Sequence, residues 1–293
     1  MDKNGNEIDN IDVEFGILKI KDTTFSQVFE ELLGEWFLEN GRLPVISSGM
    51  IGSRNGWIEA PYIACPAGPE EFAKHLSYVP LKTNNKRQKI AIVPGMSCWN
   101  EGVPDVMRGE ETQIAGFFWD KQQSGWIVLP GTHSKWVFTK NGKIESFKTY
   151  MSGEIFSLMV EHSILGKLME GEEHDHDTFK RGCRQALKSP HGLLNQLFSA
   201  RTMGLFKEIE ASGIHSFLSG LIIGCEIKEG MSHYSQKFST NDVGINLIGD
   251  IALCNLYQQA FEIANVKVNL IQNNLVLKGL YSIAQAASLY KKL

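Results

Sequence analysis

Three apolar runs of this chain each end in a glycine-rich, polar segment, and this pattern restricts the fold more than any other feature of the sequence. The segments are SSGMIGSRNGW (47–57), PGMSCWNEGVPDVMRGEETQ (94–113) and PGTHSKW (130–136). Predicted strands that alternate with helices indicate an α/β architecture, and α/β proteins place their ligands at loops that follow strands. One such loop is ordinary, whereas three predict a single composite site.

The order of the predicted elements divides the chain into two lobes, residues 1–121 and 122–293. In the first lobe we expect hairpin strands over residues 4–20, a solvated loop at 82–89 and a helix from about Met107 to Trp119. The elements expected in the second lobe are strands at 125–129, 134–140 and 143–149, helices at about 152–169, 178–188, 192–206 and 214–235, and two closing strand–helix units. A cleft between two such lobes is the expected ligand site.

The composition excludes several classes of protein. The net charge of the 293 residues is only −4, which argues against a general nucleic-acid role. The longest apolar run, FLSGLIIGC from Phe217, is too short to span a bilayer, and the polar start MDKNGNEIDN does not resemble a signal peptide. Five scattered cysteines without a C-x-x-C pair are typical of reduced thiols, so we expect a cytoplasmic protein.

The turn formed by Gly131, Thr132, His133 and Ser134 has the residue types of an anion-binding loop. Glycine lets the backbone approach an anion closely, small hydroxyl side chains add donors, and successive N–H groups form a concave nest. Lys135 follows with a positive charge. A tight hairpin with incidental polar residues explains the same segment equally well, and no G-x-x-x-x-G-K-[ST] motif is present.

The segment MRGEETQ places two acids, Glu110 and Glu111, in the first turn of a predicted helix. Acids are common there because they interact favourably with the helix dipole. Alternatively, one of them, or the nearby Asp105, is a general base that accepts a proton from a hydroxyl group. Arg108 beside them has the planar donor geometry that binds a carboxylate.

Other polar segments allow weaker interpretations. Asn55 and Trp57 lie in SRNGWIEAPY, where an amide and an aromatic ring suit a sugar acid, although a surface loop with a packed tryptophan fits as well. The run EEHDHD (172–177) suggests a metal site, but an acidic link between helices explains it better. His133 and Ser134 are adjacent in the chain and therefore do not form a convincing nucleophile pair.

Six segments, taken in order and with their spacing, resemble the 2-dehydro-3-deoxygalactonokinase family, sugar-acid kinases of the actin–hexokinase–heat-shock ATPase superfamily. They are SGMIGSRNGWIEAPY, VPGMSC, VPDVMRGEETQIAG, LPGTHSKWV, YMSGEIFSLMVEHSILG and FLSGLIIGCE. The resemblance extends over about residues 10–290. It implies a two-lobed, ribonuclease-H-like fold of the actin/hexokinase type.

The activity that the resemblance implies is transfer of the ATP γ-phosphoryl group to the 6-hydroxyl of 2-dehydro-3-deoxy-D-galactonate, with Mg²⁺, in galactonate breakdown. Glu110 would be the catalytic base, with Glu111 and Asp105 as alternatives, and Glu111 would also be placed to contact the substrate. Asn55 and Trp57 would contact the sugar acid, and Arg108 would bind its carboxylate.

The resemblance also implies where the nucleotide binds. The segment GTHSKW would be the second phosphate loop, in which Gly131, Thr132, His133 and Ser134 contact the β and γ phosphates. The late strand–helix units, around Gly249 and residues 272–279, would form the adenosine side.

Two departures from the family pattern stand out. The family normally opens with a strand that ends in an Asp-Trp-Gly phosphate loop, and no such run occurs in this sequence, so we expect that loop to be missing. Gln272 and Asn273 stand where the family tends to have Gly-Asp. A catalytically impaired relative that still binds the sugar acid is therefore the alternative function. A missing strand would also expose backbone groups and favour a homodimer, while the substrate epimer stays open.

Overall fold

The computed structural model describes residues 1–13, 16–17, 20, 23–41, 43–83, 86–119, 124–171, 173–237, 244–272 and 274–291. The chain forms two compact units. Unit 1 comprises Met1–Ser124, Thr139–Phe147 and Asn273–Leu293, and unit 2 comprises Gly125–Phe138 and Lys148–Gln272. The lobe boundary expected at residue 121 lies close to the end of the first segment of unit 1, and two later segments also belong to that unit.

A three-stranded sheet in unit 1 has the strand order β1-β4-β3. Its strands are β1 (Val45–Ser47), β3 (Ser77–Thr83) and β4 (Lys86–Ile92), and helix α1 (Phe25–Asn40) precedes them. The solvated loop expected at 82–89 was wrong for its described residues, because β3 and β4 pair antiparallel as far as Thr83 and Lys86. Backbone hydrogen bonds hold β3 and β4 together, so polar residues in this segment do not interrupt the pairing. Positions 84 and 85 lie outside the described residues.

A second three-stranded sheet in unit 1 has the order β2-β5-β6. It consists of β2 (Tyr62–Ala64), β5 (Gly95–Asn100) and β6 (Val103–Met107). Glu101 and Gly102 connect β5 to β6 with φ values of 52° and 85°, the positive pair that a tight hairpin turn of type I′ requires. Residues 95–107 are therefore a hairpin, where the sequence indicated only a glycine-rich loop, and the helix expected from Met107 starts later, as α3 (Glu110–Phe117).

The predicted hairpin over residues 4–20 is absent among the residues described there. Asn4 and Gly5 do form a turn, in which the Gly5 N–H donates to the Asp2 carbonyl oxygen at 3.1 Å, but no strand follows within the described positions. Positions 14, 15, 18 and 19 lie outside the described residues. The turn signal was therefore correct and the strand signal was not.

Helix α3 packs closely against α9 (Leu275–Ala286) in unit 1, and two glycines make this approach feasible. A Cβ atom added to Gly279 would lie 1.9 Å from the Thr112 carbonyl oxygen, and one added to Gly116 would lie 1.9 Å from the Leu275 carbonyl oxygen. The short helix α2 (Pro69–Lys74) also contacts α9. The α3–α9 contact fixes the position of the helix that carries Glu110 and Glu111.

The large sheet of the protein has five strands in the order β11-β10-β7-β8-β9. Its strands are β7 (Gly125–Leu129), β8 (Ser134–Lys140), β9 (Lys143–Tyr150), β10 (Ile245–Ile248) and β11 (Val268–Ile271). Strand β10 is parallel to both β11 and β7. The strands expected at 125–129 and 134–140 are confirmed, and the third extends one residue further than expected. Asn141 and Gly142 form the expected turn, with φ values of 52° and 71°.

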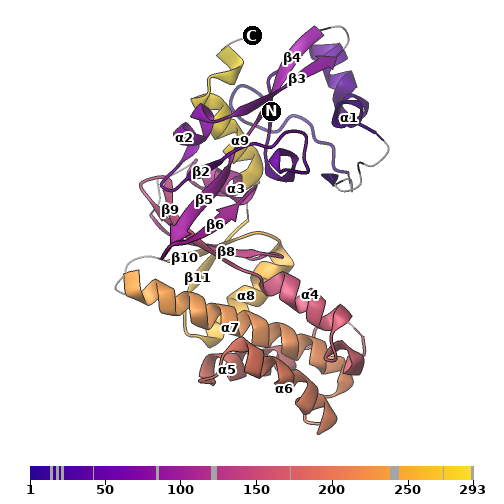
Figure 1. The fold of residues 1–293 in the computed structure, drawn as a ribbon, viewed down its shortest axis with the longest axis vertical. Helices are drawn as coiled ribbons and strands as arrows, with labels where there is room; N and C mark the ends of the chain where they lie inside the picture. Colours follow the sequence, from indigo (N-terminus) through magenta and orange to yellow (C-terminus); the bar gives the residue numbers. More distant parts are fainter. Residues whose placement is uncertain are drawn as a thin grey trace. The chain divides into compact units, whose positions relative to one another are not determined.

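Unit 2 contains most of the long helices. Its helices are α4 (Ser152–His162), α5 (His176–Lys188), α6 (Leu193–Leu205), α7 (Ile214–Lys237) and α8 (Ile251–Ile263), and α8 packs on β10 and β11. Short 3₁₀ helices occur at Gly166–Leu168 and Ala211–Gly213 in unit 2 and at Gly49–Gly52 and Leu289–Lys291 in unit 1. Figure 1 shows the long helix α7 with α5 and α6 packed beside it. The α5–α7 contact is tight because Gly182, Gly220 and Gly224 lie in it. In the described part of the chain, no helix has the length and apolarity needed to cross a membrane.

The glycine contact between α3 and α9 gives a stability prediction. Gly279→Ala should lower the free energy of unfolding by about 1–3 kcal/mol, because the added methyl group overpacks the interface. Gly34→Ala in α1 is the matched control, since its Cβ would meet only the Glu30 Cγ at 3.5 Å. That control should be neutral or stabilising by up to about 1 kcal/mol, the ordinary helix-propensity gain. Urea unfolding followed by circular dichroism measures both, and equal effects would contradict the close-packing argument.

Candidate active site

The turn between β6 and α3 brings together the acids predicted from the sequence. Gly109 is the N-cap residue of α3 and has a φ of 111°, which a residue with a side chain rarely adopts. The Glu110 Oε2 accepts a hydrogen bond from the Arg108 N–H at 3.0 Å, and the Glu111 Oε2 accepts one from the Gly109 N–H at 2.7 Å. Both carboxylates therefore satisfy backbone donors at the helix start, as the structural interpretation of MRGEETQ expected.

The two acids differ in exposure. Glu110 is half-buried, whereas Glu111 is fully buried and also accepts from the Thr112 Oγ1 at 3.1 Å. Burial raises the pKa of Glu111 to about 7, the Gly109 N–H opposes this rise, and the nearby charge of Glu110 adds to it. Asp105 lies five positions before Glu110, on strand β6, where its Oδ1 accepts from the Val106 N–H at 2.7 Å. Of the adjacent pair, only Glu110 has exposed atoms that a ligand could reach.

Arg108 connects this turn, residues 108–111 and called the acid turn below, to the loop that precedes β2. Its Nη2 donates to the Ala60 carbonyl oxygen at 2.7 Å, and the guanidinium carbon lies 4.3 Å from the centre of the Tyr62 ring. Gly52 allows the approach, because an added Cβ there would lie 3.0 Å from the Arg108 Nη1. The Arg108 Nε and Nη1 are buried without a hydrogen-bond partner among the described residues. Such donors are costly to leave unpaired and suit an anion.

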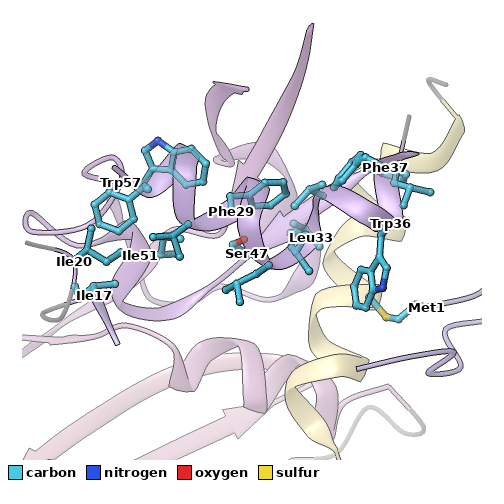
Figure 2. A pocket seen from close by; sticks show the side chains of 17 residues that line it. Met1, Ile17, Ile20, Phe29, Leu33, Trp36, Phe37, Ser47, Ile51 and Trp57 are labelled. Carbon is cyan, nitrogen blue, oxygen red and sulfur yellow. The ribbon is translucent and has the colours of Figure 1, made fainter. Parts of the chain in front are cut away.

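The two loop residues expected to contact a sugar acid have different environments. Asn55 is exposed at the tip of the loop. Trp57 instead stacks on Phe25 of α1, with ring centres 5.9 Å apart and an interplanar angle of 15°, and lies 6.0 Å from Phe29. It lines an apolar cavity of about 480 Å³ together with Phe29 and Ile51, as Figure 2 shows. The structure thus places Trp57 in hydrophobic packing, the alternative that the sequence left open.

In unit 2, the Gly131–Ser134 loop is held against the start of α4. The Thr132 carbonyl oxygen accepts from the Glu154 N–H at 3.0 Å, and the His133 Nε2 lies 2.5 Å from the Glu154 Oε2. A Cβ added to Gly153 would lie 2.5 Å from the Gly131 carbonyl oxygen. The Lys135 side chain is turned back, with its Nζ 3.2 Å from the His133 carbonyl oxygen.

This loop borders a cavity of about 890 Å³ within unit 2. Gly131 and Thr132 line it together with residues of α4, α7 and α8, among them Ser152 and His215, and with Asp250, the N-cap residue of α8. Gly249 precedes Asp250 with a φ of 150°, and a Cβ there would lie 3.3 Å from the Pro130 carbonyl oxygen. The predicted phosphate loop and the Gly249 segment therefore meet at one cavity, whose volume is typical of a small-molecule site.

The other predicted adenosine segment, residues 272–279, lies elsewhere. Its described residues from Asn274 onward begin α9, which packs on α3 in unit 1, and none of its described residues lines the 890 Å³ cavity. Asn273 lies outside the described residues. An adenosine contact of this segment remains a prediction.

Known proteins share both the sequence and the fold. The family described as 2-keto-3-deoxy-galactonokinase matches residues 1–283. The chain is 31% identical over 276 residues to the 2-dehydro-3-deoxygalactonokinase of Escherichia coli K12, which covers 94% of this chain and 89% of the relative. The chain belongs to the 2-keto-3-deoxy-galactonokinase family. The resemblance of the six segments is thereby confirmed, and this family member is a sugar-acid kinase.

Two further relatives support the assignment. A Rhizobium meliloti protein that carries the same kinase name as a probable assignment is 34% identical over 253 residues, or 83% of this chain and 78% of the relative. A crystal structure from Sinorhizobium meliloti, provisionally given the same name, has a TM-score of 0.82 and 31% identity and covers 92% of this chain and 88% of the other. The mixed α/β fold is therefore shared with this solved structure.

The run EEHDHD starts a helix in this kinase. Asp175 caps α5, because its Oδ1 accepts from the N–H groups of Asp177 and Thr178, both at 3.0 Å. His174 lines the 890 Å³ cavity. Glu172 lies outside the described residues, and among the described ones no group of three or more His, Cys, Asp or Glu could hold a metal ion. The run thus serves the helix start and the cavity wall.

Sequence reasoning missed Glu226 on α7, which is 3% exposed and lies below the Gly131–Ser134 loop. Its Oε1 accepts from the Ser134 Oγ at 2.7 Å and the Trp136 Nε1 at 2.8 Å. The signal was available, because Glu226 directly follows the apolar run FLSGLIIGC within a predicted helix. A carboxylate at the end of such a run is unusual and needs partners.

The raised pKa of Glu111 predicts a pH dependence of stability. The native state holds this proton more tightly than the unfolded chain, whose carboxyl titrates near 4.5. The stabilisation is fully present below pH 4.5 and is lost as the pH rises to about 7, a fall of about 3 kcal/mol. Glu111→Gln should remove this fall, so the variant should gain stability relative to the parent between pH 5 and pH 8. Urea unfolding at both pH values measures the difference, and parallel pH profiles would contradict the assignment.

Proposed function

We propose that this chain transfers the γ-phosphoryl group of ATP to the 6-hydroxyl of 2-dehydro-3-deoxy-D-galactonate, in galactonate breakdown. The observation that carries the proposal is the acid turn, where a reachable carboxylate and a guanidinium with unpaired donors lie together in a chain of the kinase family. Transfer to a hydroxyl group needs the carboxylate as a base, and a substrate that is an acid needs the guanidinium to bind its carboxylate. We also propose that the two units correspond to the lobes of an actin/hexokinase-type fold.

In the proposed reaction, Glu110 is the general base. Its carboxylate accepts the proton of the 6-hydroxyl as the oxygen forms its bond to the γ-phosphorus and the bond from that phosphorus to the β–γ bridging oxygen breaks, releasing ADP. Arg108 binds the substrate carboxylate through its free donors. Asn55 contacts the sugar acid from the loop tip. Glu111 and Asp105 are the alternative bases, and the burial of Glu111 makes it the weaker candidate.

The nucleotide is assigned to unit 2 in this proposal. Support comes from the 890 Å³ cavity, which has room for a nucleoside and has Gly131 and Thr132 at its edge. The start of α4 beside this loop offers the positive end of an 11-residue helix to phosphate groups. We assign the β and γ phosphates to the Gly131–Ser134 loop and the adenosine to the cavity near Gly249.

Magnesium remains part of the proposal through the resemblance. At such sites Mg²⁺ takes many of its ligands from phosphate oxygens and water, and one or two carboxylates complete them. The described residues contain no cluster of three or more metal-binding side chains, and a nucleotide-bound ion does not require one. We assign no residue to it and no step of the reaction depends on such an assignment.

The alternative of a sugar-acid-binding relative without kinase activity is not favoured. Relatives named as the kinase align over 94% and 83% of this chain. A cytoplasmic location and a homodimer stay as proposals.

A glutamine at position 110 tests the proposed base. Glu110→Gln should lower kcat by about 10²- to 10⁴-fold, the usual contribution of general-base catalysis, while KM for the sugar acid changes little. A coupled assay of ADP release measures both constants. Glu70→Gln is the matched control, because Glu70 is also an acid in the first turn of a helix in unit 1 and is exposed. A kcat close to that of the control would overturn the assignment of Glu110.

An added methyl group at position 153 tests the phosphate loop. In Gly153→Ala the Cβ would force the Gly131 carbonyl to move, so kcat/KM for ATP should fall by about 10- to 100-fold with KM for the sugar acid little changed. Gly192→Ala is the control in the same unit, because no atom lies within 4 Å of its added Cβ. If both variants kept the parental kcat/KM for ATP, the loop would not hold the phosphates.

A further inference from the structure

Glu226 is a buried carboxylate that receives hydrogen bonds from three other elements of unit 2. Its Oε1 accepts from Ser134 and Trp136 of β8, and its Oε2 accepts from the Tyr257 hydroxyl of α8 at 2.5 Å. The Ser152 hydroxyl at the start of α4 also donates to it. The side chain is 3% exposed, so no bulk water shares these contacts.

Two of the four donors of Glu226 belong to the wall of the 890 Å³ cavity. Ser152 and Tyr257 line that cavity themselves. Ser134 ends the loop that begins with Gly131 and Thr132, which also line the cavity, and the Glu154 N–H of α4 donates to the Thr132 carbonyl oxygen of this loop. A single carboxylate on α7 therefore connects β8 with two elements, α4 and α8, that line the cavity.

Stability alone does not account for such a group. Burying a carboxylate is costly, and well-packed apolar side chains often replace buried charged groups without loss of stability. Burial raises the pKa of Glu226, and the hydrogen bonds from Ser152, Tyr257, Ser134 and Trp136 oppose this rise. Fully satisfied buried polar networks instead fix one arrangement of the elements that they join.

We propose that Glu226 is a positioning residue that fixes the Gly131–Ser134 loop and the start of α4 for binding of the nucleotide phosphates. The proposal rests on the nucleotide site assigned above. A carboxylate suits this role because it only accepts hydrogen bonds when ionised, so every donor around it must point inward. The indole of Trp136 can only donate, which leaves one lone pair of Oε1 to set the direction of the Ser134 hydroxyl.

Glu226→Gln keeps the size of the side chain and replaces one acceptor oxygen with a donor group. The Trp136 indole can only donate, so the amide oxygen should stay on the Oε1 side and the NH2 group should face Tyr257 and Ser152. Those two hydroxyls would then have to accept instead of donate, which weakens the hold on the start of α4 and on the loop tied to it. We expect kcat/KM for ATP to fall by about 10- to 100-fold, with KM for the sugar acid within about twofold. Ser134→Ala should have a similar effect, and the double variant should be little worse than either single variant.

The control separates positioning from general destabilisation. Gln196 on α6 is buried in the same unit, donates to the His191 carbonyl oxygen at 2.8 Å and contacts the Cys225 Sγ, next to Glu226. Gln196→Leu should change the melting temperature without changing KM for ATP. If Glu226→Gln lowers the melting temperature but leaves the ATP constants at the parental values, or if its effect adds fully to that of Ser134→Ala, the proposal is wrong.

Amide hydrogen exchange tests the same proposal without catalysis. Glu226→Gln should raise exchange at residues 131–134 and 152–154 and leave α3 and α9 in unit 1 unchanged. Unchanged exchange at the loop would overturn the positioning role, whatever the activity. If the parent chain neither binds nor uses ATP, the proposed nucleotide site is wrong. Faster loop exchange in the variant would still show that Glu226 holds the loop.

Discussion

The acid turn of unit 1 depends on two backbone N–H groups that each donate to a glutamate side chain. The Arg108 N–H binds Glu110 and the Gly109 N–H binds Glu111, so the backbone conformation of this turn and the directions of both side chains determine each other. The turn also positions the backbone of Arg108, whose guanidinium donates to the Ala60 carbonyl oxygen. Gly109 has a φ of 111° in this turn, a conformation that a residue with a side chain rarely adopts.

The two units bury an acid in different ways, and the difference fits their proposed roles. Glu111 receives a backbone N–H and one hydroxyl, too few donors to offset burial, and its pKa rises to about 7. Glu226 receives four side-chain donors from three elements, and these oppose the rise that burial causes in its pKa. Glu111 is therefore held mainly by its own turn, whereas Glu226 joins elements that are far apart in the sequence.

Local patterns predicted the elements of unit 2 well, because strands such as β7 and helices such as α7 contain clear apolar runs, WIVL and FLSGLIIGC. The β5–β6 hairpin was missed because its short strands carry polar and glycine residues, and pairing across Glu101–Gly102 holds them together. The resemblance brought Glu110, Arg108 and Gly131 into the candidate site. It could not reveal Glu226, whose donors lie between 31 and 92 positions away in the sequence.

Neighbouring acids at a helix start cannot serve the same purpose, because successive residues of a helix point about 100° apart. At α3 this rotation sends Glu111 into the core beside Thr112 and leaves Glu110 half-buried at the surface of the turn. The close contact of α3 with α9, made through Gly116 and Gly279, fixes which way the helix is rotated. Which of the two adjacent acids is exposed is therefore set by backbone packing one to two turns further along the helix.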